Sequence, residues 1–417
     1  MKNNSIPEIR FTGFTDAWEQ CEFKKVFDVH TDFVSNGSFQ ALKDNVKLYH
    51  TENYAYMIRL QDASNNWRGP WLYTDKKGFE FLNKSTVYEN DILMSDRGTI
   101  GEFFLVPKLD KPMTLSSNAV LLRSSKNNNY FIYYLLNTKE VGNQIKMRTT
   151  PGVQPMISKT EFKKITAKFP RLNEQKRIGE FFSNLDHLIT LHQRKLNNVK
   201  NLKTGLLQKM FPKNGEVFAE FRFPGFTDAW EQRRLGEMCV IGDIDHRMPD
   251  SVIDGIPYIM TGDFIGINGL DFENSKQVSL GDYEQLSQKI KPEQGDILFA
   301  RYASVGTVRY VETLEKFLVS YSCAILKPDE TINGKCLFYY LQSDACQQQI
   351  QLEINNGSQR NVGIDSLKKL KICAPSMKEQ SLIAELLTHV DTLITLHQCE
   401  LDALKKTKKA FLQKMFV

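Results

Sequence analysis

The sequence contains no long apolar run. No window approaches the roughly 20 apolar residues that a membrane-spanning helix needs, and the N-terminus, MKNNSIPEIRF, lacks the apolar stretch of a secretion signal. Cysteine is scarce: the seven cysteines are an odd number and include no Cys-x-x-Cys pair. We therefore expect free thiols, a cytoplasmic location and no membrane partner.

Signatures of catalysis are also missing. The sequence has no Gly-x-x-x-x-Gly-Lys-Ser/Thr phosphate loop, no Gly-x-Ser-x-Gly and no His-Glu-x-x-His. It also has neither the Asn-Pro-Pro or Asp-Pro-Pro motif nor the Phe-x-Gly-x-Gly that mark methyltransferases acting on bases. Pro249-Asp250 and Pro328-Asp329 could begin a nuclease acidic pair, but neither is followed at usable spacing by Asp/Glu-x-Lys. We interpret both as turns and predict no catalytic residue.

The charge and composition set only wide limits. A formal net charge of +5 permits a nucleic-acid partner without requiring one. Hydrophobic residues at 41% and charged residues at 25% are typical of a folded globular protein, and 417 residues suit two domains better than one.

The sequence repeats itself. FTGFTDAWEQ begins at Phe11 and FPGFTDAWEQ at Phe223; EQKRIGEFFSNLDHLITLHQ begins at Glu174 and EQSLIAELLTHVDTLITLHQ at Glu379. Both copies then run on to QKMF. The decapeptides are 212 positions apart and everything from Asp91 onward is 205 apart, so the copies differ in length between Gln20 and Asp91. The chain is therefore a tandem duplication.

Each copy combines a globular segment with a long helix. We predict a first domain at residues 1–170, a central helix at 171–212, a second domain at 213–375 and a C-terminal helix at 376–417. The alternative, two unrelated domains that share a short motif, does not explain a match that continues without a gap from Asp91.

Both helical segments carry a heptad seam, with apolar residues at alternating steps of three and four from Phe182 and from Leu387. A helix of about 38 residues is roughly 57 Å long, and one apolar stripe does not stabilise it alone, so we expect the two copies to pair. The predicted seam contains Leu185, Ile189, His192, Leu196 and Val199 in the first helix and Val390, Ile394, His397, Leu401 and Leu404 in the second.

Connectivity favours an antiparallel pair, because a parallel pair would have to return the chain along the whole helix through one intervening domain. The C-terminus, which directly follows the second QKMF, is then expected near the N-terminal decapeptide. The expected fold class is α+β. It has two mixed α/β domains, each followed by a long helix, and the helices form an antiparallel coiled coil in a near-circular, pseudo-twofold arrangement.

Two seam histidines, His192 and His397, could share a metal ion across the pair. Our reading finds no carboxylate or cysteine one helical turn away on the same seam, so we predict no metal and expect the histidines to fix the register. A further leucine stripe is wide for a two-helix seam and indicates packing on the helix's own domain or a further protein partner. It contains Leu188, Leu191, Leu202, Leu393 and Leu396.

The globular segments share a framework but differ at two loops. One loop follows the strands that begin at Asp91 and Asp296; the other covers residues 146–154 in the first copy and 351–361 in the second. Loops drift after any old duplication, but these carry side chains that can hydrogen-bond base edges. The DNA-binding candidates are Arg97, Arg148, Thr149, Gln154, Arg301, Tyr302, Gln359, Arg360 and Asn361.

Taken together, these motifs resemble the DNA-specificity subunit of type I restriction-modification systems, in the style found in Gram-positive bacteria. The resemblance covers nearly the whole chain. It rests on GFTDAWEQ at the start of each copy, the Gly-Asp-Ile-Leu type of strand, the proline followed four residues on by Glu-Gln, and the LITLHQ helices that end in QKMF. The first copy departs from it with Glu89-Asn90 where the second has Gln294-Gly295.

The resemblance implies a non-catalytic subunit whose two target-recognition domains each read one half of a split, asymmetric site in double-stranded DNA. It implies that the long helices act as a spacer and as a docking surface for two methyltransferase subunits, with restriction and translocase subunits joining through the complex. S-adenosylmethionine, ATP and magnesium are then expected on the partner subunits, with no cofactor in this chain.

Two alternatives remain at the level of sequence. One is a protein-binding scaffold with a coiled-coil spacer, which salt-insensitive or absent binding to duplex DNA would favour. The other is a self-sufficient nuclease or methyltransferase with divergent motifs, which methylation or cleavage by the purified chain alone would establish.

Overall fold

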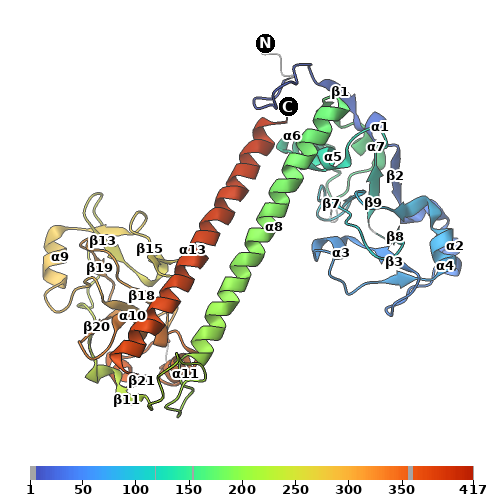
Figure 1. The fold of residues 1–417 in the computed structure, drawn as a ribbon. Coiled ribbons are helices and arrows are strands. Elements are labelled where there is room, and N and C mark those ends of the chain that lie inside the picture. Colours follow the sequence, from blue (N-terminus) through green and yellow to red (C-terminus); the bar gives the residue numbers. More distant parts are fainter. Residues whose placement is uncertain (1–5, 118, 153–154, 356–359, 417) are drawn as a thin grey trace. The chain divides into compact units, whose positions relative to one another are not determined.

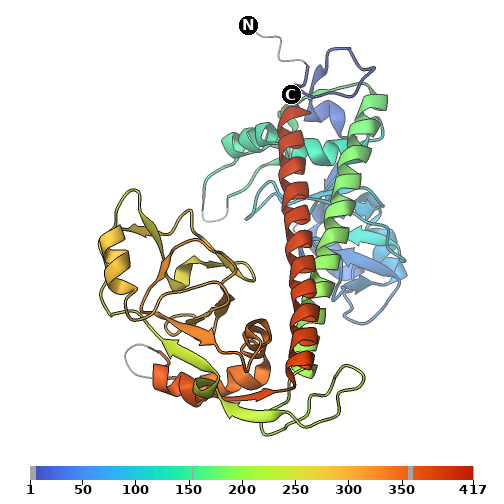
Figure 2. The same ribbon diagram turned by 60° about the vertical axis from the view of Figure 1, so that its left-hand side comes forward.

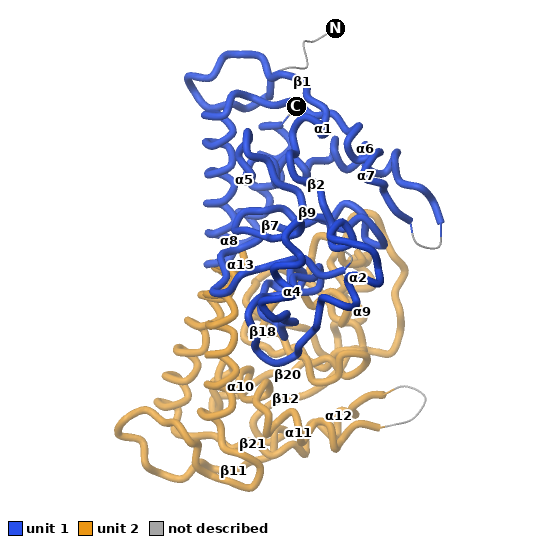
Figure 3. The backbone as a smooth tube through the Cα atoms, turned by 90° about the vertical axis from the view of Figure 1, so that its right-hand side faces the viewer, with its two compact units in different colours: residues 1–191, 401–417 blue, residues 192–400 orange. Residues whose placement is uncertain are grey.

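The computed structural model describes residues 6–117, 119–152, 155–355 and 360–416. The chain divides into two compact units (Figures 1 and 3): unit 1 comprises Met1–Leu191 and Leu401–Val417, and unit 2 comprises His192–Glu400. Each unit therefore holds one globular segment together with parts of both long helices. Within the described ranges, no helix is long and apolar enough to cross a membrane.

Unit 1 is built on a four-stranded antiparallel sheet of order β2-β9-β6-β7. A second sheet has order β4-β3-β8-β5, and β1 pairs with β10. The strands are β1 (Glu19–Glu22), β2 (Val29–Asp32), β3 (Ala55–Ile58), β4 (Tyr73–Thr74), β5 (Thr86–Val87), β6 (Ile92–Met94), β7 (Phe103–Leu105), β8 (Met113–Leu115), β9 (Val120–Arg123) and β10 (Thr166–Phe169). The short helices are α1 (Phe23–Val26), η1 (Phe33–Asn36), α2 (Phe39–Asn45), α3 (Leu60–Ser64), α4 (Lys76–Phe81), η2 (Asn83–Ser85), α5 (Asn129–Leu136), α6 (Lys139–Arg148) and α7 (Lys159–Lys163).

Unit 2 repeats this plan with the main sheet β12-β20-β17-β18, a second sheet β16-β13-β19 and the pairs β11-β21 and β14-β15, which can be followed in yellow and orange in Figure 2. The strands are β11 (Glu231–Arg234), β12 (Cys239–Gly242), β13 (Ile256–Ile259), β14 (Phe264–Ile265), β15 (Gly269–Leu270), β16 (Lys276–Val278), β17 (Ile297–Ala300), β18 (Val308–Tyr310), β19 (Leu318–Val319), β20 (Cys323–Pro328) and β21 (Lys371–Ala374). The helices are η3 (Leu235–Glu237), η4 (Thr261–Asp263), α9 (Leu280–Leu286), α10 (Gly334–Tyr340), α11 (Asp344–Leu352) and α12 (Ile364–Lys369). The long helices are α8 (Leu172–Lys209) and α13 (Met377–Lys414), each of 38 residues.

The central strands β6 and β17 of the main sheets are buried on both faces, which explains the apolar residues that follow Asp91 and Asp296. Side chains of a strand alternate between faces. In β17, Ile297 and Phe299 join a core that includes the neighbouring long helix, whereas Leu298 joins a second core under the smaller sheet. In β6, Ile92 and Leu93 divide between two cores in the same way.

The same caps start corresponding helices in both units. Asn128 accepts a hydrogen bond from the Phe131 N–H at the start of α5, and Thr138 accepts one from the Val141 N–H at the start of α6. Side-chain oxygens at this position satisfy backbone donors that the helix leaves unpaired. The equivalent caps in unit 2 are Asn333 for α10 and Ser343 for α11.

In each unit, the repeated decapeptide and the residues just before it contact the C-terminal end of a long helix. In unit 1, the Trp18 ring lies 6.3 Å from the Phe416 ring, and the Ile9 N–H donates to the Lys414 carbonyl at 3.0 Å. The expectation that the C-terminal end lies near the N-terminal decapeptide is thereby confirmed within unit 1. In unit 2 the matching contacts join Trp230 to Phe211, 6.2 Å apart, and the Phe221 N–H to the Lys209 carbonyl at 2.8 Å.

The Pro-x-x-x-Glu-Gln motif anchors the first turn of each long helix. The buried Glu174 carboxylate accepts two hydrogen bonds of 2.7 Å from Arg10, and Gln175 donates to the Pro170 carbonyl and accepts from the Asn128 N–H. Bidentate pairing of this kind fixes geometry as well as charge. Unit 2 has the same set: Arg222 on Glu379, and Gln380 between Pro375 and Asn333.

The departure of the first copy at Glu89-Asn90 does not alter the turn. Asn90 adopts a left-handed φ of 66°, and Gly295 at the equivalent position has a φ of 96°. Asparagine tolerates this region better than other residues with a side chain. The turn before β6 is therefore preserved despite the substitution.

The difference in length between the copies falls mainly between the first strand of the main sheet and the smaller sheet. In unit 1 this connection carries η1 and α2, whereas residues 243–255 of unit 2, all of them described, form no helix or strand. The connection from β3 to β6 also differs in its elements, since β14 and β15 have no counterpart among the described strands of unit 1. The change of offset between the two copies therefore reflects differences in more than one connection.

Candidate nucleic-acid interface

The two loops singled out in unit 1 lie together. Arg97, just after β6, forms an isolated bridge with Met156, and Thr150, just after α6, forms another with the same residue. The Gly98 N–H also donates to the Pro155 carbonyl at 3.3 Å. Backbone pairing therefore joins the two loops, which are some fifty residues apart in the sequence, into one tip.

The candidates on this tip differ in how free they are to bind. The Arg97 side chain is 59% exposed, with the Asp96 carboxylate 3.7 Å away. Arg148 is half-buried and donates to the Gln144 carbonyl at 3.3 Å, while the Thr149 hydroxyl donates to the Ile145 carbonyl at 2.8 Å. Arg97 is thus the candidate most available to DNA, and Gln154 lies outside the described residues.

Unit 2 joins its two loops in the same way. Tyr302, just after β17, bridges Asn361, and the Val362 N–H donates to the Arg301 carbonyl at 3.1 Å. Ala303 holds a left-handed φ of 56°, where unit 1 has Gly98 at 74°. Arg360 is exposed, with one guanidinium nitrogen 3.5 Å from the side-chain oxygen Oε1 of Gln351, and Gln359 lies outside the described part of the chain.

Arg301 does not have the surface position that we predicted for a DNA contact. Its side chain is only 7% exposed and forms an ion pair with Asp243, while its Nε donates to the Val362 carbonyl at 2.9 Å. A guanidinium that leaves a buried carboxylate would strand both charges, which costs far more than a base contact returns. We therefore correct its role: Arg301 supports the joint between the two loops.

Asp243 is the centre of this support. Lys289 donates to one carboxylate oxygen at 3.0 Å, and His246 lies 3.1 Å from the other. Burial favours the protonated form of Asp243, but the hydrogen bonds from His246 and Lys289 and the charge of Arg301 together hold its pKa below the ordinary value. Asp243 therefore remains ionised and keeps Arg301 in place.

An aromatic group beside this tip was missed by the sequence reasoning. The His246 ring stacks on Tyr321 with centroids 4.9 Å apart, and Tyr302 lies edge-on to Tyr321 at 6.5 Å. Flat, partly exposed rings of this type can contact bases or sugars. No motif marked either ring: His246 lies in the stretch where the two copies lose their alignment, and Tyr321 aligns with Ser116 of the first copy, so the ring is present in one copy only.

Comparison with known proteins identifies the family of this chain. The sequence profile described as the type I restriction modification DNA specificity domain matches the chain twice, over residues 16–201 and 227–406. The chain belongs to the type I restriction-modification specificity-subunit family. It is 25% identical over 363 residues to the specificity subunit of the type I restriction enzyme MjaVIII of Methanocaldococcus jannaschii, covering 82% of this chain and 83% of the relative.

Solved structures show the same fold. A type I restriction-modification S subunit from M. genitalium superposes with a TM-score of 0.62 at 16% identity, covering 99% of both chains. A chain from a structure of complex assembly and conformational transition in the type I system gives a TM-score of 0.51 at 17% identity, covering 97% of this chain and 99% of that one. The paired globular segments of this specificity-family chain thus have the fold of S subunits.

The seam residues predicted on the long helices are buried or half-buried in their own units. Leu185 and Leu196 of α8 and Val390, Ile394 and Leu401 of α13 are each less than 10% exposed. The remaining predicted members are half-buried: Ile189, His192, Val199, His397 and Leu404. By contrast, the second leucine stripe stays exposed, from 39% at Leu191 to 52% at Leu202.

The two lysines that interrupt the seam each bind a carboxylate and a tyrosine. In unit 2, Lys203 of α8 lies 2.8 Å from an Asp391 oxygen of α13, the Tyr339 hydroxyl donates to the same carboxylate at 3.1 Å, and the ammonium lies over the Tyr339 ring. Unit 1 holds the equivalent triad of Lys408, Asp186 and Tyr134. Each triad fastens a globular segment to both long helices.

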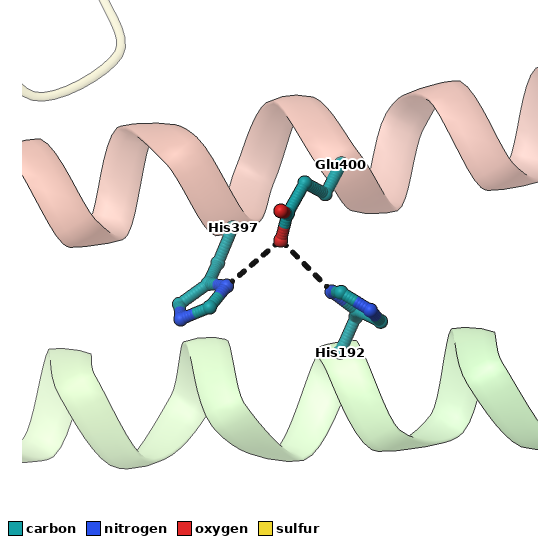
Figure 4. A group of neighbouring side chains, drawn as sticks. All are labelled: His192, His397 and Glu400. Carbon is teal, nitrogen blue, oxygen red and sulfur yellow. Dashed lines mark hydrogen bonds and ion pairs between the residues drawn. The ribbon is translucent and has the colours of Figure 1, made fainter.

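The seam histidines have a neighbour that the sequence reasoning overlooked. Glu400 lies one turn beyond His397, and its Oε2 is 3.0 Å from Nδ1 of both His397 and His192 (Figure 4). The search for a third ligand was confined to the seam itself and therefore passed over Glu400, which lies beside the seam although its side chain reaches both histidines.

Proposed function

We propose that this specificity-family chain reads a bipartite, asymmetric site in double-stranded DNA, with the joined loops of each unit reading one half. The observation that carries the proposal is that both units hold two loops together by the same backbone bridges while presenting different side chains. A shared framework with different tips is suited to reading two different short sequences at a fixed geometry.

The side chains on the tips suit contact with DNA. Arg97 in unit 1 and Arg360 in unit 2 are exposed guanidinium groups, and a guanidinium can bond two acceptors of a guanine edge or a phosphate. Unit 2 adds the rings of Tyr302, His246 and Tyr321. Because the two tips differ in charge and aromatic content, their half-sites should differ too.

The long helices are proposed to form an antiparallel coiled-coil spacer. In unit 2, Lys203 meets Asp391 while His192 meets Glu400, so residues later in α8 contact residues earlier in α13. In unit 1, Phe181 meets Phe411 and Asp186 meets Lys408, which follows the same order. Opposite chain directions within each unit support a pair that runs antiparallel through its length.

The exposed leucine stripe of the helices is the proposed docking surface for two methyltransferase subunits. Apolar side chains left open on a long helix mark a site of protein association. Restriction and translocase subunits would join through that complex, and S-adenosylmethionine, ATP and magnesium would be bound by the partners. In this arrangement the present chain supplies recognition and spacing and no chemistry.

Alanine substitution of the tip arginines tests the assignment. In the assembled complex, Arg97→Ala and Arg360→Ala are each expected to weaken binding of the cognate duplex by about 1–3 kcal/mol and to relax preference at a base pair in one half-site only. Fluorescence anisotropy against a set of single-base-pair variants measures both effects. A uniform loss on all sequences would identify a phosphate contact instead.

The matched control is Arg171→Ala, because that side chain is 83% exposed and directly precedes α8, outside the joined loops of unit 1. It should leave affinity and base preference unchanged. If Arg97→Ala and Arg360→Ala behave like this control, the tips do not bind DNA. Insensitivity of binding to salt would point to a protein scaffold.

A further inference from the structure

His192, His397 and Glu400 form a compact group at the middle of the long helices. Their potential ligand atoms all lie within 4.8 Å of one another, and the imidazole rings are 6.1 Å apart at 70° (Figure 4). His192 comes from α8, whereas His397 and Glu400 come from successive turns of α13. Two imidazoles and a carboxylate thus converge from two helices on one point.

The group is not satisfied by hydrogen bonds alone. Glu400 Oε2 accepts a hydrogen bond from His397 Nδ1 at 3.0 Å. His192 Nδ1 is shielded from solvent and lies 3.0 Å from the same oxygen, yet within the described part of the chain it makes no hydrogen bond of acceptable geometry. A buried ring nitrogen that lies against a carboxylate without a well-aligned hydrogen bond is a costly arrangement, and a cation bound between the two groups would remove that cost.

The two distances from Glu400 to the histidines are close to those around a small divalent ion. Zinc binds imidazole nitrogen and carboxylate oxygen at about 2.0–2.2 Å, so two ligands of a tetrahedral ion lie about 3.3 Å apart. The two contacts of 3.0 Å are close to that value before any adjustment. The Glu400 side chain is 40% exposed, which leaves solvent access for a fourth ligand.

We propose that His192, His397 and Glu400 bind one zinc-like divalent cation that joins α8 to α13 at their midpoint. Imidazole and carboxylate donors suit zinc, and also nickel and copper, better than magnesium, which prefers an all-oxygen shell. The site would stiffen the helix pair without taking part in DNA recognition or methylation. The proposal of a metal site is therefore independent of the function proposed above.

Only the second copy of the repeat supplies the carboxylate of this site. His192 and His397 are equivalent positions of the two copies, but Glu400 corresponds to Lys195, which is exposed. A symmetric pair of histidines thus acquires a carboxylate from the second copy only. One ion per chain is the expected stoichiometry, and Glu400→Lys, which restores the residue of the first copy, should abolish binding.

The binding test uses the full-length chain, stripped with a chelator, in a Cys399→Ser background that removes the exposed thiol near the site. Isothermal titration with zinc chloride should give one site. His192→Gln with His397→Gln, and separately Glu400→Gln, should weaken it at least roughly 10- to 100-fold, the range caused by loss of even an outer-shell partner. Bound ion should raise the unfolding temperature by roughly 5–10 °C at about 100 times Kd, and magnesium should not.

The matched control removes two other histidines of the same helices, His187 and His389, both exposed. His187→Gln with His389→Gln should bind zinc as the parent does. The proposal is overturned if the parent binds no zinc, if the His192 and His397 variant binds as tightly as the parent, or if binding disappears with Cys399→Ser alone. Circular dichroism of each variant shows whether the helices remain folded.

Discussion

Replacing Asp243 with alanine is expected to lower the free energy of unfolding of unit 2 by about 3–5 kcal/mol, the usual result of removing one partner of a buried ion pair. The Asp243 and Arg301 side chains are only 8% and 7% exposed, so the guanidinium would be left charged without a counterion. Its bond to the Val362 carbonyl, which joins the two loops of the unit 2 tip, would then weaken as well. Urea unfolding followed by hydrogen exchange at β17 and β20 measures the loss.

The control for this variant is Glu312→Ala in the same unit. Glu312 and its partner Lys335 are 60% and 36% exposed, and surface pairs of this kind contribute about 0–1 kcal/mol. Asp243→Leu combined with Arg301→Met removes both charges and should recover most of the stability. If Asp243→Ala costs no more than Glu312→Ala, the buried pair does not support the loops.

Inserting four residues after Asn197 is expected to widen the gap between the two half-sites while leaving their base sequences unchanged. The insertion adds about one helical turn, or about 6 Å, close to two base-pair steps of about 3.4 Å. The unspecified gap should therefore grow by one or two base pairs, the smaller value arising if the partner helix or the DNA absorbs part of the change. Mapping methylated sites in cells that carry the variant measures the gap.

Two further variants test whether the length of the helix pair sets the gap. Insertion at the equivalent place of the second helix as well, after Asp402, keeps the helices equal and should give the full change. Insertion after Gly215, an exposed residue in the connection beyond α8, should leave the gap as it was. A target with altered bases and an unaltered gap would show that the helices do not set the spacing.

The duplication allowed the two globular segments and the two long helices to be predicted, because a sequence match between the copies implies the same structure at both places. The seam could be read from heptad spacing alone, and its lysines recur in register. The aspartates that bind these lysines, Asp186 and Asp391, could not be predicted. In sequence, an aspartate beside the seam cannot be distinguished from one that is exposed to solvent, because the position of the opposing lysine is not known. Even so, the contacts of the decapeptide with QKMF followed from connectivity.

The tips formed by the joined loops were harder to predict, because they depend on pairings between distant segments. Arg301 was taken for a surface residue since its partner Asp243 lies 58 positions away, in the stretch where the two copies lose their alignment. His246 was missed for the same reason, whereas Tyr321 was missed because the aligned residue of the first copy is Ser116 and no shared motif marks the position. Arg97 was identified because its loop follows directly from a strand that the repeat aligns.

The most direct test is to map every methylated position in the DNA of a host that carries this chain with its methyltransferase subunits, and in the same host without this chain. We predict one split target, with two different specified segments separated by a constant number of unspecified base pairs, that is lost when the chain is absent. A continuous palindromic target, or methylation that persists without the chain, would contradict recognition by two different units.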